Sequence, residues 1–482
     1  MKRTAALILS MILLCGCSAS QQPAATTGTG TEQGSASQSE QEMYAQDAQQ
    51  LVYAVEACHP AFALEGLIPP DYDKASKEFL KSAKKANSLD EFEVLVNNYL
   101  ALMDDTHTAI VKSTQPDGEG TLQNIGKYSL DLKVTEKGNV LYLADENGKS
   151  TGETVTSVGG VSTEVIFGTI SKMFPSENML TDMILRGKYA LDKQILAISG
   201  CDTEKDTIEV VCSNGTLELP FVETQQEKDT VSDKTAEAKM IGDILYLDVN
   251  SFASKDEDFV AVTDKAREFV QNGGSKVIID VRKNIGGDDK RLNELLSALD
   301  MSVPVGRMIE RHSKSEWESI KKDPKASTED KTYSETPSSS NLSKANPNVD
   351  LVVICDYDSK DISVALCSGV QNGGLGKVIG RPPMNSLNFY LAPMEYELPN
   401  THIPVTISSA YRYRNDESAF QQYFVPDEMP AANEDLLEYT VKNHFGEEYT
   451  SDSEAPAQEA PAEETTAEAA PAQEAPAEET TA

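Results

Sequence analysis

The chain has 482 residues, and its 78 acidic and 42 basic side chains give a formal net charge of −36 at pH 7. This length allows two or three domains. The acidic balance makes nucleic acids and anionic lipid head groups poor partners, so no nucleic-acid partner is expected.

The first twenty residues, MKRTAALILSMILLCGCSAS, combine a basic tip, a short apolar run and a small residue before Cys17. The apolar run is too short for a stable membrane span and is typical of a signal peptide. Residues 14–17 resemble a bacterial lipobox, in which Cys17 would be acylated; an ordinary secretory signal with a chance cysteine is the alternative. We expect residues 1–17 to be a lipoprotein signal peptide and the protein to be extracytoplasmic, lipid-anchored to the bacterial cell membrane.

Residues 18–42 contain mostly Gln, Ser, Thr, Gly and Ala, a composition that predicts a flexible tether. The pattern then becomes helical over residues 43–115. Its clearest apolar positions recur at spacings of four and three, as one stripe of a helix requires: Phe92, Val96, Tyr99 and Leu102. An N-terminal helical region is therefore expected.

Residues 127–223 contain short β-like segments, with Gly159-Gly160 at a predicted tight turn and a helical stretch at about 176–198. Five cysteines remain after Cys15 and Cys17, and none has CxxC spacing, which argues against a disulfide scaffold or a zinc site. Cys201 and Cys212 flank a strand-like stretch and could pair in an oxidising compartment.

Residues 236–445 alternate apolar strands with amphipathic helices, which predicts a layered α/β domain with a buried sheet. The polar stretch 321–348 is expected to be mainly loop. Residues 446–482 repeat the sequence APAQEAPAEETTA and hold no large apolar residue after Tyr449, so we expect a disordered acidic tail.

Three short stretches carry candidate chemistry. Gly286-Gly287 follows a strand, where exposed backbone N–H groups suit an anion, although a plain turn is the alternative. Ser363 lies between a strand and a helix, where a serine is either a nucleophile or an N-cap. His107, in LMDDTHTAI, is either a general base or a hydrogen-bonded structural histidine.

Taken in order, these pieces resemble the tail-specific, or C-terminal processing, serine protease family, in its tricorn-like, histidine-containing branch. The resemblance extends over roughly residues 50–435, and DVRKNIGG is its most specific element. The matching pieces are His59-Pro60, Asp105-Thr106-His107-Thr108, Asp280 to Gly287, Asp361-Ile362-Ser363-Val364-Ala365, Gly380, Leu398-Pro399-Asn400 and Pro426-Asp427.

The resemblance implies a ClpP/crotonase-like α/β serine peptidase domain in which Ser363 attacks a peptide carbonyl and His107 is the general base. Gly286, Gly287 and Val364 would form the oxyanion hole. The β-rich region would be a PDZ-like insertion that binds peptide, with a plain β insertion as the alternative. No metal or other cofactor is implied.

Several positions depart from the family pattern. The glycine before the histidine is Thr106, and the threonine before the serine is Asp361. The tricorn-like glutamate before Pro426-Asp427 is not evident, since Glu417 is displaced from its place. An acid beside a nucleophile raises the pKa of its hydroxyl. The sequence therefore predicts a membrane-tethered serine peptidase acting on protein or peptide substrates. The alternative is a catalytically inactive peptide-binding lipoprotein on the same fold.

Overall fold

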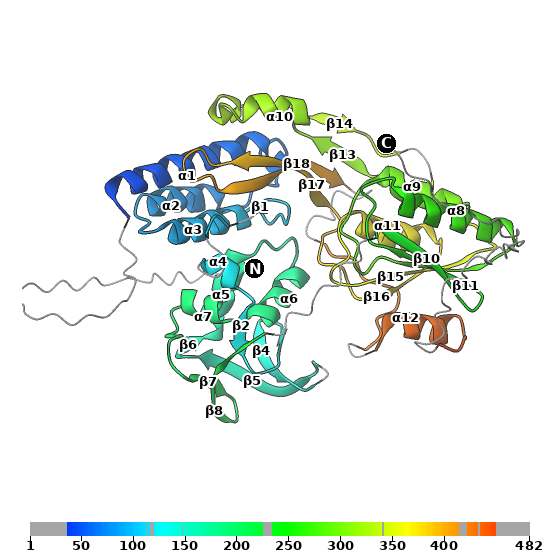
Figure 1. Ribbon diagram of the computed structural model, residues 1–482, viewed down its shortest axis with the longest axis horizontal. Helices are drawn as coiled ribbons and strands as arrows, with labels where there is room; N and C mark the ends of the chain where they lie inside the picture. Colours follow the sequence, from blue (N-terminus) through cyan, green and yellow to red (C-terminus); the bar gives the residue numbers. More distant parts are fainter. Residues whose placement is uncertain are drawn as a thin grey trace, which may run out of the picture. The chain divides into compact units, whose positions relative to one another are not determined.

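The computed structural model describes residues 36–111, 113–115, 120–146, 148–224, 234–339, 342–413, 422–431 and 434–449 (Figure 1). The predicted signal peptide, Cys17, most of the tether and the repeat tail from residue 450 lie outside the described residues. Within the described ranges, no helix has the length and apolar character needed to cross a membrane.

The N-terminal region begins earlier than the sequence suggested. Helix α1 (Gln38–Cys58) starts inside the expected tether, because Ser37 forms a capping box with Glu40. The Ser37 hydroxyl accepts a hydrogen bond from the Glu40 N–H, and the Glu40 carboxylate accepts one from the Ser37 N–H. The predicted helical region is confirmed by α1 and by three further elements: η1 (Pro60–Phe62), α2 (Tyr72–Ala83) and α3 (Leu89–Ala101).

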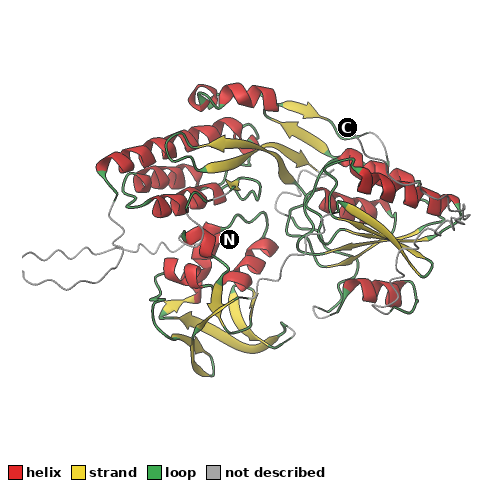
Figure 2. Cartoon of the chain, viewed as in Figure 1, coloured by secondary structure: helices red, strands yellow, loops and turns green. Residues whose placement is uncertain are grey.

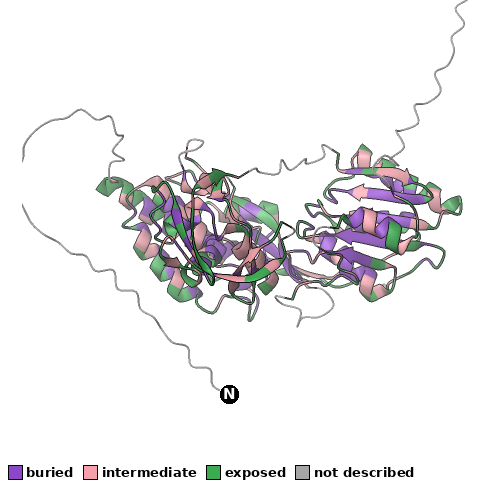
Figure 3. Cartoon of the chain, turned by 90° about the horizontal axis from the view of Figure 1, so that it is seen from below, coloured by how far each residue is buried: buried purple, intermediate pink, exposed green. Residues whose placement is uncertain are grey.

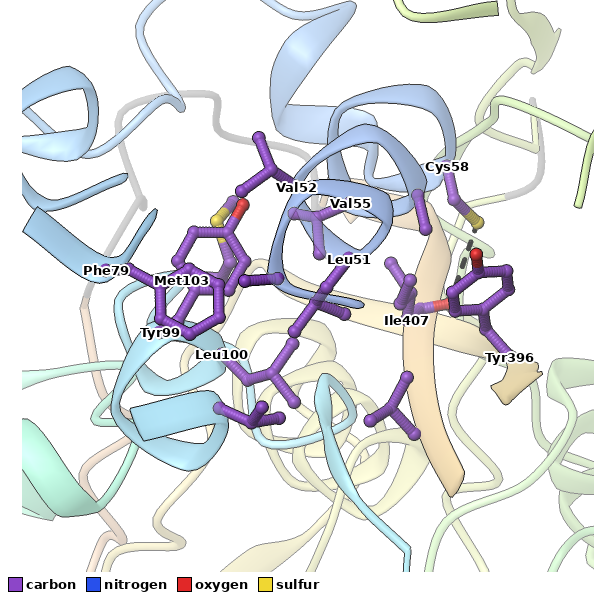
Figure 4. Close-up of a cluster of buried hydrophobic side chains, with 14 of the residues drawn as sticks. Leu51, Val52, Val55, Cys58, Phe79, Tyr99, Leu100, Met103, Tyr396 and Ile407 are labelled. Atoms are coloured by element: carbon purple, nitrogen blue, oxygen red, sulfur yellow. Dashed lines mark hydrogen bonds between the residues drawn. The ribbon is translucent and has the colours of Figure 1, made fainter. Parts of the chain in front are cut away.

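These helices share a hydrophobic core with strands from much later in the chain (Figure 4). The strands form an antiparallel sheet: β1 (Ala109–Ile110), β18 (Pro404–Tyr413), β13 (Arg307–Glu310) and β14 (Ser334–Thr336), with β17 (Phe389–Glu397) paired to β18. Leu51, Tyr99 and Ile407 belong to this core, and the Cys58 thiol donates to the Ile407 carbonyl. Strands from residues 307–413 therefore stabilise the N-terminal helices.

The region 127–223 contains more helix than the sequence suggested. Its strands are β2 (Tyr128–Leu130), β3 (Val134–Lys137), β4 (Val140–Ala144), β5 (Ser150–Val158), β6 (Val161–Ser162), β7 (Ile208–Cys212), β8 (Gly215–Leu219) and β9 (Phe221–Glu223). Its helices are α5 (Thr163–Met173), α6 (Met179–Tyr189) and α7 (Lys193–Ile198), preceded by the short α4 (Thr121–Asn124). The predicted helical stretch began at residue 176, whereas Ser162 caps α5 from position 163.

The sheet of this region has the order β3-β4-β5-β7-β8, and every pair in it is antiparallel. Gly159-Gly160 forms the predicted tight turn, between β5 and β6. Cys201 and Cys212 are buried free thiols, so the pairing considered from the sequence is not formed.

The α/β region confirms the predicted alternation of strands and helices (Figure 2). Its sheet has the order β10-β11-β12-β15-β16, in which β10 is antiparallel and the other pairs are parallel. The elements are β10 (Ala236–Ile241), β11 (Ile244–Val249), α8 (Glu257–Gln271), β12 (Lys276–Asp280), α9 (Asp289–Ala298), β15 (Asp350–Cys355), α11 (Ile362–Gly373) and β16 (Lys377–Gly380).

Both faces of this sheet are covered, and the four parallel strands are buried along most of their length (Figure 3). On one face Leu247, Ile279 and Val353 pack with apolar residues of α8, α9 and α11. On the other, alternating residues such as Ile278 pack with α12 (Leu436–Tyr439) and the π-helical turn Thr440–His444. This explains the near-continuous apolar runs of the strands.

The stretch 321–348 is mainly loop among its described residues, as predicted, but carries the 3-10 turn Pro324–Ser327 and strand β14. Helix α10 (Lys314–Ile320) precedes it and buries the indole of Trp317, whose Nε1–H donates to the Glu395 carbonyl.

Asp47 connects α1 to the turn between β17 and β18. Its buried carboxylate accepts hydrogen bonds from the backbone N–H groups of Asn400 and Thr401 and from both side chains. We expect Asp47→Ala to lower the free energy of unfolding by about 3 kcal/mol, because four donors lose a charged acceptor. Urea unfolding measures this loss; Asp71→Ala, at an exposed helix start without a side-chain cap bond, is the control. Equal stability of the two variants would contradict the role of Asp47.

Candidate active site

The candidate site lies where two parallel strands of the α/β sheet end. Strand β12 leads into the Gly286-Gly287 turn, and its neighbour β15 leads into the loop before α11. The two loops are joined by hydrogen bonds from the Lys360 N–H to the Asn284 carbonyl, 2.9 Å, and from the Ser359 hydroxyl to the Val281 carbonyl, 2.8 Å. Parallel strands end at the same edge, where α/β folds place their sites.

Asp361 sits at the sharp turn between β15 and α11. Its backbone has φ 50° and ψ −103°, a strained conformation for a residue other than glycine. The Asp361 N–H donates to the Asn385 side-chain oxygen over 3.1 Å. Its carboxylate Oδ2 lies 3.0 Å from His107 Nε2, while Oδ1 is buried without a hydrogen-bond partner among the described residues.

Ser363, the predicted nucleophile, lies two residues after Asp361, in the first turn of α11. Its side chain is 0% exposed, and its Oγ has no hydrogen-bond partner among the described residues. The residue that the structure brings to His107 is therefore Asp361. The sequence had treated Asp361 only as a departure near the serine.

His107 lies between two carboxylates. Its Nε2 faces Asp361, and its Nδ1 lies 3.5 Å from Asp105 Oδ1. Burial alone would lower the pKa of His107, but hydrogen bonds and charges from Asp105 and Asp361 raise it to about 11. The ring is therefore an imidazolium at neutral pH, with both nitrogens protonated.

Asp105 is the fully buried member of this group. It accepts hydrogen bonds from the His107 backbone N–H, 2.9 Å, and the Thr108 hydroxyl, 2.5 Å, and its Oδ2 lies 3.2 Å from His59 Nε2. Burial works against ionisation, yet the two histidines hold the pKa of Asp105 well below its usual range. His59 and Asp105 thus fix the position of His107.

The backbone N–H groups of the three residues predicted for an oxyanion hole differ in whether they already have an acceptor. The Gly286 N–H donates to Asn284 Oδ1 over 2.9 Å, and the Val364 N–H donates to the Asp361 carbonyl over 3.0 Å. The N–H groups of Gly287 and Ile362 have no acceptor among the described residues. Of the three predicted donors, only Gly287 has an unoccupied N–H, and Ile362 offers one that the sequence analysis missed.

Glu177 is a second buried acid that the sequence analysis missed. It is 4% exposed and accepts hydrogen bonds from the Thr106 hydroxyl, 2.8 Å, the Asn385 amide, 2.7 Å, and the Ser386 N–H, 3.0 Å. No motif marks the FPSEN loop that carries it. Asn385 contacts both Glu177 and Asp361, so it connects this acid to the strained turn.

A small apolar pocket of about 170 Å³ adjoins this group. Its polar part includes Asp104, Glu177, Ser386 and Asn388. The apolar part includes Leu67, Ile68, Pro69, Met103, Phe389 and Tyr390. A pocket of this size and lining suits one apolar side chain of a bound peptide.

Asp105, His107 and Glu177 have potential ligand atoms within 4.8 Å of one another, the spacing of a possible metal site. In this structure the same atoms are directed at other protein groups: His107 Nε2 faces Asp361 Oδ2, Asp105 Oδ2 faces His59 Nε2, and Glu177 Oε1 accepts from Thr106 and Asn385.

Comparison with known proteins agrees with this architecture. Residues 243–429, which include β11 to β18 and the strained turn, match the model of Peptidase family S41. Over this segment, which is less than half of the chain, the protein is similar to the S41 serine-type peptidases. The match supports the expected family at the level of S41 for the α/β region. The tricorn-like, histidine-containing branch and the individual roles of Ser363 and His107 stay predictions.

Several solved structures of low identity are similar to the chain. Mature CPAF has 11% identity and a TM-score of 0.49, and the match covers 84% of this chain and 96% of that one. The photosystem II D1 C-terminal processing protease has 14% identity and a TM-score of 0.36, with coverage of 81% and 93%. A lipoprotein from Streptococcus agalactiae has 9% identity and a TM-score of 0.36, with coverage of 84% and 95%. No curated protein matches the chain.

The titration of Glu177 gives a test of this geometry. Burial, aided by the charges of Asp105 and Asp361, raises the pKa of Glu177 from 4.5 to about 7. Between pH 4.5 and 7 the folded state therefore holds a proton that the unfolded state has released. The free energy of unfolding consequently falls as the pH rises through this interval.

We expect Glu177→Gln to remove a pH-dependent loss of about 3 kcal/mol over that interval. Urea unfolding at several pH values measures it, and the exposed Glu164→Gln is the matched control. If the profile of Glu177→Gln ran parallel to that of the wild type, Glu177 would not titrate as described.

Proposed function

We propose that the protein is an extracytoplasmic, lipid-anchored member of the S41 peptidase family that binds unfolded protein or peptide without cleaving it through a serine. One observation carries the proposal: His107 Nε2 faces the Asp361 carboxylate at 3.0 Å, while Ser363 is buried and its hydroxyl has no partner in the described part of the chain. The lipobox-like sequence before Cys17 supports the location. No metal or organic cofactor is needed for such binding.

The protonation of His107 argues against hydrolysis by this site. A general base must accept the proton of the attacking hydroxyl, and its pKa works best near the operating pH. With a pKa of about 11, the ring of His107 has no free lone pair at neutral pH. Among the described residues, no base is hydrogen-bonded to the buried hydroxyl of Ser363.

The site nevertheless offers groups that bind a polypeptide. The N–H groups of Gly287 and Ile362 can donate to a peptide carbonyl, and the neighbouring pocket can hold an apolar side chain. Strand β8 is the last strand of its sheet, and its residues are mostly exposed. A peptide strand can add to this edge, as in the PDZ-like mode expected from the sequence.

Serine-dependent hydrolysis is the second candidate function, and the S41 match favours it. It requires the first turn of α11 to rearrange, so that the Ser363 hydroxyl replaces Asp361 beside His107. The two candidates differ in whether Ser363 reacts.

Unfolded casein tests both functions, with fluorescence anisotropy to measure binding and release of soluble fragments to measure cleavage. We expect the full chain to bind casein, to release no fragments and to resist labelling by a fluorophosphonate. Ser363→Ala should behave like the wild type. Ser368→Ala is the matched control, because Ser368 is a buried serine of the same helix whose hydroxyl donates to the Val364 carbonyl.

Cleavage that is lost in Ser363→Ala and kept in Ser368→Ala would establish the serine peptidase and refute the binding proposal. Absence of both binding and cleavage would refute the two together.

Membrane attachment has a separate test. We expect Cys17→Ser to move the protein from the membrane fraction to the soluble fraction of cells, because the thiol that accepts the lipid is removed. Incorporation of labelled fatty acid should be lost in the same variant and kept in Cys15→Ser. Membrane attachment of Cys17→Ser would contradict lipidation at this position.

A further inference from the structure

We infer that Asp361 occupies the position from which this site would present a nucleophile, and that the rest of a serine hydrolase site is assembled around it. A single substitution, Asp361→Ser, should therefore create hydrolytic activity. The inference rests on the proposed function, in which the wild-type site does not act through a serine.

The backbone at residue 361 gives the first argument. A nucleophile in an α/β hydrolase is held on a strained turn between a strand and a helix, which exposes its side chain above the sheet. Asp361 has this arrangement, with a φ of 50° between β15 and the twelve-residue helix α11. Strain of this kind persists only where surrounding contacts fix it, and here the Asp361 N–H is bound by Asn385.

The chain of acid–base groups gives the second argument. His107 Nε2 points at the side chain of residue 361, and Asp105 lies beside His107 Nδ1. His59 and Thr108 in turn hold Asp105. This order, a residue on a strained turn, an imidazole and a buried carboxylate, is the geometry of a catalytic triad.

The fit of the carboxylate gives the third argument. Only one oxygen of Asp361 is bonded, whereas Oδ1 is buried without a partner among the described residues. One hydroxyl would keep the bond to His107 and remove the unpaired oxygen. It would also remove the charge that, with Asp105, holds His107 as an imidazolium, so that the ring could act as a base.

The Gly286-Gly287 turn contributes to the remaining part of a hydrolase site, the donors for an oxyanion. A Cβ on Gly286 would lie 2.6 Å from Asp361 Oδ2, so the turn and residue 361 are in direct contact. Gly287 follows Gly286 directly and Ile362 follows residue 361, and neither N–H group has an acceptor among the described residues. The N–H of Ile362 belongs to the positive end of α11. Two such donors suit the oxyanion of a tetrahedral intermediate.

The reaction of the Asp361→Ser variant follows from these contacts. The new hydroxyl oxygen bonds to the peptide carbonyl carbon while its proton passes to His107 Nε2, and the carbonyl oxygen becomes an oxyanion. When the intermediate collapses, the C–N bond breaks and His107 returns the proton to the leaving amine. Water, deprotonated by His107, then hydrolyses the acyl-enzyme and restores the hydroxyl.

The experiment compares full-chain wild type, Asp361→Ser, Asp361→Asn and the double variant Asp361→Ser/His107→Ala. Each is assayed for casein hydrolysis and fluorophosphonate labelling, with the labelled residue located by peptide mass spectrometry. We expect labelling at position 361 and hydrolysis in Asp361→Ser, at least about 100-fold above Asp361→Asn. The double variant should lose both signals.

A folded Asp361→Ser protein that neither labels nor hydrolyses would overturn the inference. Label located on Ser363 in this variant would do the same. Cleavage by the wild type, or its failure to bind casein, would count instead against the proposed function. The two failures are therefore distinguishable.

A second variant covers the case in which Asp361→Ser fails to fold. In Asp361→Cys, the thiol beside His107 should react with iodoacetamide at pH 6 at least about tenfold faster than in Asp361→Cys/His107→Ala, because the imidazole favours the thiolate. Equal rates would show that His107 does not act on position 361, which would contradict the inference.

Discussion

The carboxylates of Asp105 and Asp361 share one imidazolium, and the geometry of the whole site depends on this arrangement. All three groups are mostly buried, and a buried charge without a partner is costly. The arrangement therefore fixes the loop that carries His107 against the start of α11, 254 residues away in sequence. The same charge balance raises the pKa of His107 to about 11, which favours the proposed binding function over hydrolysis.

Much of the α/β region could be predicted from the sequence because its strands are apolar on both faces and its helices on one. Burial on both faces leaves a continuous apolar run, and the polar positions of the helices mark their exposed side. The start of α1 was missed for a local reason. The composition of residues 36–42 is that of a linker, and the capping box of Ser37 and Glu40 determines the helix start.

The site itself was predicted only in part, and the choice between Asp361 and Ser363 shows why. The two residues lie two positions apart in one motif. Each helical residue turns by about 100°, so side chains two apart point to nearly opposite sides. Which of them faces His107 depends on where the helix begins. A sequence pattern indicates the start of a helix only to within one or two residues. Asp361 and Ser363 are two residues apart, so the pattern does not decide which of them faces His107.

Glu177 and Asn385 could not be predicted at all. Their contact joins residues 208 positions apart, and neither belongs to a motif. Both are recognisable only once the fold brings Thr106, Glu177 and residue 361 to the same place.

The DVRKNIGG motif, the most specific part of the family resemblance, is explained mainly by the requirements of folding. Asn284 is fully buried, with its Nδ2 donating to the Val249 carbonyl and its Oδ1 accepting from the Gly286 N–H. A Cβ on Gly287 would lie 2.2 Å from the backbone of Phe252, so this position requires glycine whether or not a substrate is cleaved. Packing alone therefore accounts for Asn284 and Gly287 in DVRKNIGG, and the motif can persist in a protein whose chemistry has changed. The chemistry depends instead on the one side chain that the strained turn presents to His107, which here is a carboxylate.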